Sequence, residues 1–207
     1  MATKWIRRTA VGSILALAVG SASCGDVSQG RSPVLAVILS LQGASGAQPD
    51  DFGSFLLSDV VTLVDRSGVQ TPTIFNDVGQ VTMQLVLKDP GGPGLPGATT
   101  ELNAVTFTRY RVIYRRADGR NTPGVDVPFG FDGASTFTVT NDGTVTAGFE
   151  LVRIIAKQEA PLLALANNGN VITTIAEVTF FGRDLAGNAV QSTGSIQVNF
   201  GNFADPD

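Results

Sequence analysis

The segment at residues 105–116, VTFTRYRVIYRR, constrains the fold of this chain more than any other, because its side chains alternate in character with a period of two. Tyr110, Val112 and Tyr114 fall on one face of an extended segment. The arginines on the opposite face are Arg109, Arg111 and Arg115. Only a β-strand places every second side chain on one face. The pattern therefore predicts a long strand with an aromatic face and a basic face.

The segment at residues 78–88 repeats this alternation, and the composition agrees with it. The chain has 24 glycines and 10 prolines, and charged residues make up only 15% of it. Such a composition favours a turn-rich β fold over a helical bundle or disorder. Other strands are expected at 55–65, 69–75, 126–131, 136–140, 144–156, 172–183 and 195–200. The continuous apolar run at 33–41 is expected to form a buried strand, or alternatively a short buried helix.

Two segments are not expected to be strands. Residues 89–98, DPGGPGLPGA, cannot join a ladder because proline lacks an amide donor and glycine is costly to order, so a loop is expected. Residues 157–166, KQEAPLLALA, are expected to form one short crossover helix, with Pro161 tolerated in its first turn and residues 167–169 as its cap. The fold class expected is thus all-β.

The first residues have the pattern of an export signal. Lys4, Arg7 and Arg8 precede an apolar segment at 10–19, and small residues lie before the single cysteine, Cys24. An apolar helix of about ten residues is about 15 Å long, half of a hydrocarbon core, and is too short to span a membrane permanently. Residues 1–23 are therefore expected to be a signal peptide.

The small residues before Cys24 resemble the lipobox of bacterial lipoproteins, although Ser21 stands where that family prefers leucine. The resemblance implies acylation of Cys24 with palmitate-type chains, which would anchor the chain to a membrane. Gly25, in place of an aspartate, implies sorting to the outer membrane. Ordinary secretion with cleavage nearby is the alternative.

Removing residues 1–23 leaves 184 residues with 11 basic and 18 acidic side chains, a net charge of −7. A charge of this sign argues against a nucleic-acid partner. Residues 24–32 are expected to form a flexible tether, and residues 33–207 a single domain of a size that can bury a core.

Three segments resemble strands C, F and G of bacterial immunoglobulin-like or fibronectin type III-like sandwiches: the strand around Tyr110–Tyr114, the crossover near 157–169, and the closing AEVTFFGRDLAGNAV and SIQVNF. The resemblance covers residues 70–203. It implies an antiparallel β-sandwich with extra N-terminal strands, and no activity, since such domains have many functions. The nearest class of protein that these features resemble is a lipid-anchored bacterial envelope protein.

The chain contains no histidine, which excludes catalytic groups built on Ser-His-Asp or Cys-His and removes the commonest zinc ligand. Carboxylate chemistry remains open. Asp50 and Asp51 are an acidic pair that can serve a hydrolase acting on a glycan, or they are solvated charges before a strand. No cofactor is expected.

Two further groups of residues are candidates for binding. Calcium ligands can come from the turns at Asp132, Asp142, Asp184 and Asn188, although these side chains also close turns on their own. An acidic partner can bind the basic stripe formed by Arg109, Arg111, Arg115, Arg116 and Arg120. The alternative for the stripe is that cross-strand acids neutralise it, with Asp118, Asp126 and Glu150 as candidates.

Together these features predict a non-catalytic, lipid-anchored envelope protein that acts as a binding or scaffolding module. Its partner would be an envelope protein or a glycan, contacted through loops such as 89–98 and 117–124. One alternative is the glycan hydrolase. Another is a subunit of a surface assembly, in which the strand at 33–41 is donated to a neighbouring copy. The oligomeric state cannot be derived from these patterns.

Overall fold

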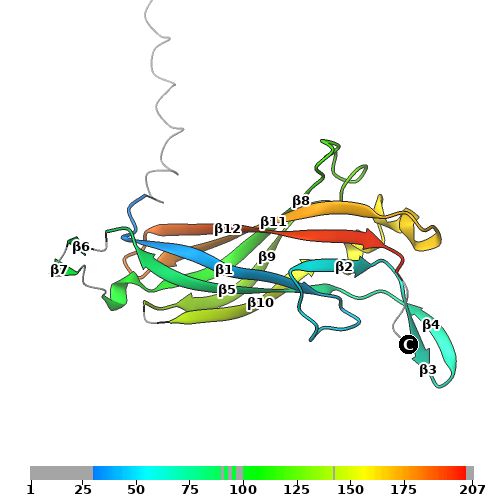
Figure 1. Ribbon diagram of the computed structural model, residues 1–207, viewed down its shortest axis with the longest axis horizontal. Coiled ribbons are helices and arrows are strands. Elements are labelled where there is room, and N and C mark those ends of the chain that lie inside the picture. Colours follow the sequence, from blue (N-terminus) through cyan, green and yellow to red (C-terminus); the bar gives the residue numbers. More distant parts are fainter. Residues whose placement is uncertain (1–29, 90, 93–94, 97–99, 142, 204–207) are drawn as a thin grey trace, which may run out of the picture.

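The structure is a computed structural model that describes residues 30–89, 91–92, 95–96, 100–141 and 143–203. The signal peptide, Cys24 and Asp142 lie outside the described residues. The fold is mainly β, which confirms the expected class (Figure 1). The long strands are β1 (Val34–Ala44), β5 (Asp77–Leu87), β8 (Val105–Arg115), β9 (Phe131–Val139), β10 (Thr144–Val152), β11 (Ile172–Asp184) and β12 (Ala189–Gly201). The short strands are β2 (Phe55–Asp59), β3 (Thr62–Arg66), β4 (Val69–Thr73), β6 (Gly91–Gly92) and β7 (Leu95–Pro96).

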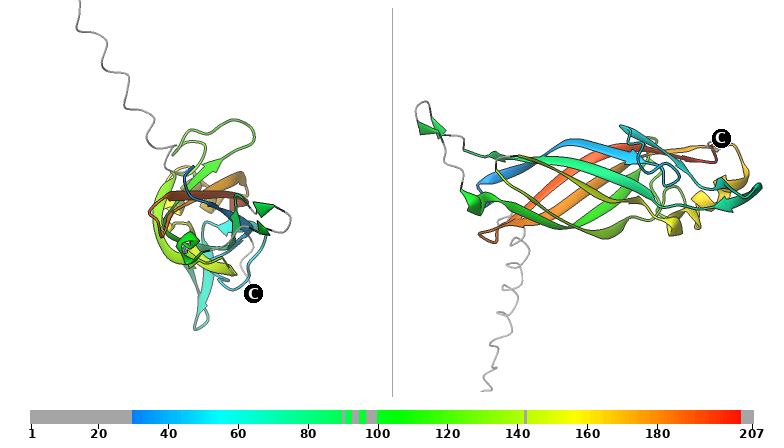
Figure 2. Two further views of the ribbon diagram at one scale, coloured as in Figure 1. Left: turned by 90° about the vertical axis from the view of Figure 1, so that its left-hand side faces the viewer. Right: turned by 90° about the horizontal axis from the view of Figure 1, so that it is seen from below.

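Two main sheets enclose the core. One has three strands in the order β1-β5-β10, and the other has five in the order β2-β12-β11-β8-β9. Viewed along the long axis, the five-stranded sheet curls into a half-barrel and the three-stranded sheet faces its open side (Figure 2). The hairpins β3-β4 and β6-β7 form separate two-stranded sheets. The short pair β6-β7 lies within residues 89–98, so the expectation that this segment joins no ladder is wrong there.

The two sheets approach each other along both edges. On one side the chain passes from β9 in the large sheet to β10 in the small one, and Ser135 Oγ donates a 3.0 Å hydrogen bond to the carbonyl of Gly148 across the gap. On the other side β1 packs against β12, where a Cβ on Gly194 would lie 3.0 Å from Ile38 Cδ1. Glycine at this position therefore allows the close approach of the two strands.

One pairing departs from the antiparallel arrangement expected of the domain. β2 pairs with β12 in parallel, from Phe55 opposite Gln197 to Asp59 opposite Gly201. This geometry requires a connection that returns the chain to the same end of the sheet, and the sequence pattern of an isolated strand carries no information on its partner's direction.

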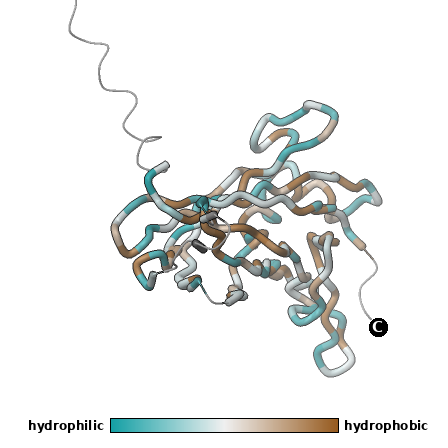
Figure 3. Tube along the Cα trace, turned by 60° about the vertical axis from the view of Figure 1, so that its left-hand side comes forward, coloured by the Kyte–Doolittle hydropathy of each residue, from teal (hydrophilic) through white to brown (hydrophobic). Residues whose placement is uncertain are grey.

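The alternation expected at 78–88 and 105–116 is confirmed in β5 and β8, where buried and more exposed positions follow each other. The expectation for 33–41 is wrong in one respect. The segment is a strand, but Leu35 and Leu39 are 51% and 49% exposed, because only one face of β1 meets the core. Figure 3 shows hydrophobic positions along the strands and mostly hydrophilic positions in the loop that projects after β8.

Other element boundaries also differ from expectation. The strand expected at 55–65 is interrupted at Val60 and Val61, and the one expected at 126–131 begins only at Phe131. The helix expected at 157–166 is instead a short α2 (Ile154–Lys157) followed by a 3₁₀ helix η2 (Leu162–Asn167). Pro161 lies between them and has no amide hydrogen to donate to a continuous helix. A second 3₁₀ helix, η1 (Glu101–Asn103), precedes β8.

An aromatic cluster joins the sheets across the core. Tyr110 of β8 packs against Phe149 of β10 and Phe180 of β11, with ring centroids 5.2 and 6.1 Å away. Two glycines make room for these rings, since a Cβ on Gly79 would meet the Phe149 ring and one on Gly133 would meet the Tyr110 ring. Each glycine lies opposite its aromatic partner in the strand register.

Candidate functional site

The arginines of β8 are distributed between two environments. Arg111 forms a bidentate ion pair with Asp132 of β9, with both nitrogen–oxygen distances at 2.9 Å. The hydrogen bond from Arg111 lowers the pKa of Asp132, and Asp132 raises the pKa of Arg111. Arg115 pairs with Glu177 of β11 at 2.7 Å. These two cations are therefore neutralised by acids on the neighbouring strands.

The next two arginines share a single acid. Arg116 and Arg120 both bind Asp118, at 2.6 and 2.8 Å, and their hydrogen bonds hold the pKa of this carboxyl well below its usual range. Asp118 thus acts as expected. The other two acids expected to neutralise the stripe do not: Asp126 accepts the amide of Thr122, and Glu150 pairs with Arg153.

Arg109 differs from the rest of the stripe. Its guanidinium lies 4.3 Å from the ring centroid of Phe181 on β11, and no ion pair joins it to an acid among the described residues. The register of β8 and β11 shifts between Phe181 and Gly182, which lie opposite Arg109 and Phe107, so Thr108 is an extra residue in β8 relative to β11. Thr108 and Arg109 are consequently both exposed. Bulges of this kind re-aim side chains and often lie beside binding sites.

A groove of about 560 Å³ lies at this bulge, and we call it the bulge groove. Its lining comes from β8, from the end of β11 and from the start of β12, which are neighbours in the large sheet. The lining residues are Thr106, Thr108, Arg109, Phe181, Gly182, Arg183, Asp184, Leu185, Ala189, Val190 and Gln191. The groove thus combines two guanidinium groups with hydroxyl and amide groups and with the apolar side chains of Phe181 and Leu185.

The turn between β11 and β12 fixes the charges at one end of the bulge groove. Arg183 donates a 2.9 Å hydrogen bond from Nη1 to the carbonyl of Gly187. Asp184 is almost completely buried and accepts hydrogen bonds from the Asn188 amide at 2.8 Å and from Asn188 Nδ2 at 2.9 Å. Arg109 and Arg183 are both positively charged, whereas Asp184 is the one acid of the groove lining and is hydrogen-bonded to Asn188. The groove therefore has a local positive charge.

The floor of the groove offers no free strand edge. β11 is paired on both sides, with β12 and with β8, over nearly its whole length. A ligand in the bulge groove therefore meets side chains, and cannot extend the sheet with its own backbone.

The residues considered for calcium are not brought together. Asp132 is engaged with Arg111, and the oxygens of Asp184 are engaged with Asn188, so both close local structure. Within the described residues there is no group of three or more cysteine, aspartate or glutamate side chains arranged to hold a metal.

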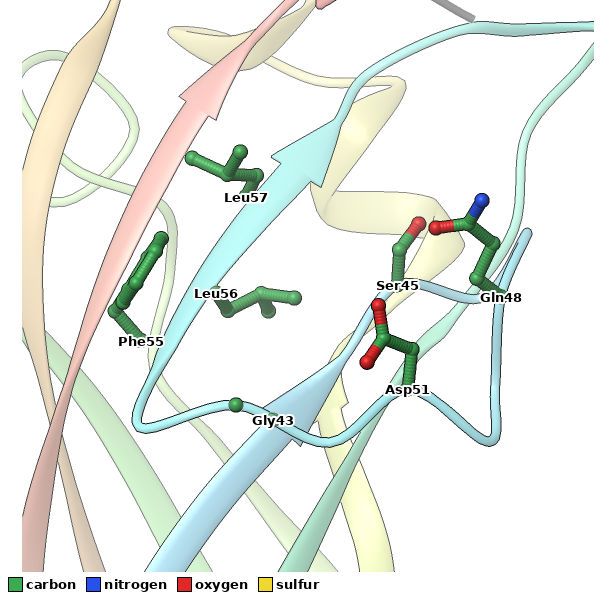
Figure 4. A pocket seen from close by; sticks show the side chains of 8 residues that line it. Gly43, Ser45, Gln48, Asp51, Phe55, Leu56 and Leu57 are labelled. Atoms are coloured by element: carbon green, nitrogen blue, oxygen red, sulfur yellow. The ribbon is translucent and has the colours of Figure 1, made fainter. Parts of the chain in front are cut away.

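The acidic pair Asp50 and Asp51 lies in the loop between β1 and β2. Asp51 lines a hollow of about 240 Å³ together with Ser45, Gln48, Phe55 and Leu57 (Figure 4). Asp51 is the one carboxylate in the lining of this hollow, just as Asp184 is in the bulge groove. Asp50 and Asp51 are both exposed on the loop, beside Gln48 and Pro49. This arrangement favours solvated charges over the facing carboxylates that hydrolysis of a glycan requires.

Sequence reasoning found Arg109 but missed Thr108 and Arg183. The bulge that exposes Thr108 has no signature in the alternating pattern. Arg183 could have been found, because Phe181 and Arg183 lie on the same face of an alternating strand.

No helix among the described residues has the length and apolar character needed to cross a bilayer. Comparison with protein-family models, curated proteins and solved structures finds no match for this chain.

Proposed function

We propose that this chain is a non-catalytic, lipid-anchored protein of the bacterial envelope whose domain binds an acidic glycan in the bulge groove. The observation that carries the proposal is the contrast among the arginines of β8, β11 and the loop after β8. Arg111, Arg115, Arg116 and Arg120 are paired with acids, whereas the two arginines of the groove have no acidic partner among the described residues. Guanidinium groups recognise carboxylates through paired hydrogen bonds.

The groove chemistry favours a saccharide over a peptide. Hydroxyl and amide groups of Thr106, Thr108 and Gln191 match the hydroxyls of a sugar, and Leu185 offers an apolar contact for a ring face. An extended peptide gains much of its affinity from backbone hydrogen bonds at an open sheet edge. The floor of this groove has no such edge, because β11 is paired on both sides.

The immunoglobulin-like relationship is part of the proposal. The order β12-β11-β8 corresponds to strands G, F and C, and β1-β5-β10 corresponds to strands A, B and E of such a domain. This correspondence supports a curled variant of the sandwich in which β11 and β12 carry the closing segment that resembles strands F and G. In immunoglobulin-like domains, function resides in particular surfaces and not in the fold.

Calorimetric titration with oligogalacturonate, a saccharide with one carboxylate per residue, tests the binding proposal. We expect saturable binding that weakens with salt, and a loss of about tenfold or more in Arg109→Gln and in Arg183→Gln. Arg115→Gln is the matched control, since Arg115 is exposed and basic but pairs with Glu177 outside the groove. Its affinity should equal that of the wild type.

Poly-glutamate and a neutral galactan serve as comparison ligands in the same titrations. Binding of poly-glutamate without oligogalacturonate would overturn the glycan and indicate an acidic protein. Equal binding of the galactan, or equal losses in all three arginine variants, would overturn recognition through charge at this groove.

The membrane anchor rests on the sequence around Cys24. Its support is the export pattern before the cysteine and the absence of a second cysteine with which it could form a disulfide. Gly25 supports sorting to the outer membrane. Intact-mass measurement of the wild type and Cys24→Ala after membrane fractionation tests it. A diacyl or triacyl mass in the membrane fraction, lost in the variant, is expected; an unmodified soluble wild type would contradict the anchor.

A second candidate function, a subunit of a surface assembly, is favoured by one surface. The outer face of the β1-β5 ladder carries four exposed apolar side chains: Leu35, Val37, Leu39 and Val86. β1 itself is paired with β5 of the same chain along its length. Association would therefore occur through this face without donation of the strand. Sedimentation velocity of wild type and Leu35→Ser across a range of concentrations would detect it as association that the variant loses.

A further inference from the structure

A lysine and an aspartate lie together in the core, far from the bulge groove. Lys157, the last residue of α2, places Nζ 2.9 Å from Asp77 Oδ1 at the start of β5. Their side chains are 1% and 0% exposed. Ser58 Oγ donates to Asp77 Oδ2 at 2.6 Å, and the Gly46 amide donates to Oδ1 at 3.0 Å. Every side-chain polar atom in this cluster has a partner.

Burial disfavours the charged form of Asp77. Removing two charges from water costs several kcal/mol per ion, and attraction between them offsets this cost only in part. Desolvation raises the pKa of Asp77 despite the opposing effects of Lys157 and Ser58. Passage of one proton from Nζ to the carboxylate along the 2.9 Å hydrogen bond gives a neutral amine beside a neutral carboxylic acid.

The choice of cation is informative. The chain has 11 arginines and only 3 lysines, namely Lys4, Lys88 and Lys157. Arginine is the usual cation in buried ion pairs, because its planar guanidinium binds carboxylates in a bidentate manner and stays charged. A lysine amine, by contrast, is a nucleophile once its proton has passed to another group. This core therefore holds the cation that can react.

We propose that Lys157 and Asp77 condense into an intramolecular amide bond. The neutral Nζ attacks Cγ of the protonated carboxyl, and the Ser58 hydroxyl stabilises Oδ2, the oxygen that gains negative charge. Oδ1, which already carries the proton passed from Nζ, takes a second proton from Nζ and leaves as water. One ammonium and one carboxylate thus give one amide and one water molecule, with no change in oxidation state.

Proximity and dryness favour this reaction. Groups held in a reactive orientation have effective concentrations of about 10⁵–10⁸ M, and exclusion of bulk water removes the reactant that reverses the condensation. The product would close a covalent ring from β5 to α2 that contains β8, β9 and β10. Ser58 and Gly46, which come from β2 and the loop before it, are packed against the same bond.

Tryptic peptide mapping of the purified full chain tests the proposal. Cleavage at arginine and lysine gives a peptide 67–88 that contains Asp77, and an amidated Lys157 resists cleavage, which leaves a peptide 154–183 intact. We expect one branched species that joins these two peptides at a mass lower by one water, about 18 Da. Dehydration at the Asp-Gly sequences 118–119, 132–133 and 142–143 would appear in other peptides.

Variants connect the branched peptide to its chemistry. Lys157→Arg keeps a cation and should abolish the branch, whereas Lys88→Arg changes an exposed lysine and should retain it. Asp77→Asn should give the identical branch by loss of ammonia. Recovery of linear 67–88, 154–157 and 158–183 from the wild type in full yield would overturn the proposal and leave a plain buried ion pair.

Discussion

The hydrogen bond donated by the Tyr114 hydroxyl allows a quantitative prediction of what one side chain contributes to the stability of this fold. The chain has two tyrosines, both on β8, and both hydroxyls reach across the core to one bulge in β10. Tyr114 donates a 2.7 Å hydrogen bond to the carbonyl of Leu151, which the bulge leaves without a partner in the register with β5. The hydroxyl of Tyr110 accepts the amide of Glu150 at 3.1 Å. Burial raises the pKa of both phenols, so both remain protonated at neutral pH.

Tyr114→Phe removes the donor and keeps the ring. The Leu151 carbonyl then loses its partner in a position that is fully buried. A buried polar group without a partner costs about 1–3 kcal/mol of unfolding free energy. With a urea m-value of about 2 kcal/mol per molar, the unfolding midpoint should fall by about 0.5–1.5 M. Tyr110→Phe should cost less, about 0.5–1.5 kcal/mol, because its hydrogen bond is only partly buried.

Urea unfolding followed by far-ultraviolet circular dichroism measures both changes. The m-value should be unchanged, because a single hydroxyl does not alter the surface exposed on unfolding. An effect of Tyr114→Phe below about 0.5 kcal/mol, or a larger effect in Tyr110→Phe, would refute the reasoning that the inter-sheet hydrogen bond to Leu151 stabilises the bulge.

Two further predictions concern a glycine and a buried carboxylate. In Gly79→Ala the new Cβ would lie 2.6 and 2.7 Å from two Phe149 ring carbons, so the ring must move against Tyr110 and Phe180, and we expect a loss of about 1–3 kcal/mol in urea unfolding. Gly148→Ala on β10 is the control, since its nearest atom would be 4.0 Å away, and an equal loss there would contradict the steric explanation. Burial acts to raise the pKa of Asp184, but hydrogen bonds from Asn188 outweigh it and the pKa is lowered. Its contribution to stability is therefore present above the unfolded pKa of about 3.9 and is lost as the pH falls through the lower folded value. Asp184→Asn should reduce the acid dependence of the unfolding midpoint below about pH 5, and an unchanged profile would contradict this assignment.

Local patterns were sufficient to predict individual strands. The period of two in residues 78–88 and 105–116 survives in β5 and β8, because one face of each strand meets the core. The apolar run at 33–41 was misleading, since β1 is covered on one face only and its other face keeps Leu35 and Leu39 exposed. The alternation of apolar and polar residues shows which side chains share a face of a strand, but not whether another part of the protein covers that face.

Non-local features could not be predicted in this way. The arginines at 109 and 111 have the same period and the same chemistry, yet Arg111 lies opposite Asp132 on β9, whereas Arg109 lies opposite Ala134 and Phe181 and forms no ion pair among the described residues. Lys157 was expected as the first residue of a short crossover helix, with no role in the core. Its burial depends on Asp77, which is 80 positions earlier in the chain. Contacts of this separation are set by the packing of the whole domain.

The expected tether offers a smaller example. Residues 24–32 were assigned to it from their polar composition, but Ser32 is almost completely buried at the start of β1. Its hydroxyl contributes to the lowered pKa of Asp184 in the turn that borders the bulge groove. Among the described residues, the packed part of the domain therefore begins before Pro33.

Backbone-amide NMR titration with oligogalacturonate tests the central claim, recognition of an acidic glycan by the bulge groove, most directly. The account predicts saturable shifts that concentrate at Thr108, Gly182 and Gln191 and need about tenfold more ligand or greater in Arg109→Gln, with the resonances of Leu35 and Asp51 unchanged. Shifts confined to the outer face of β1 or to the loop that contains Asp51, or no shifts at saturating ligand, would contradict it.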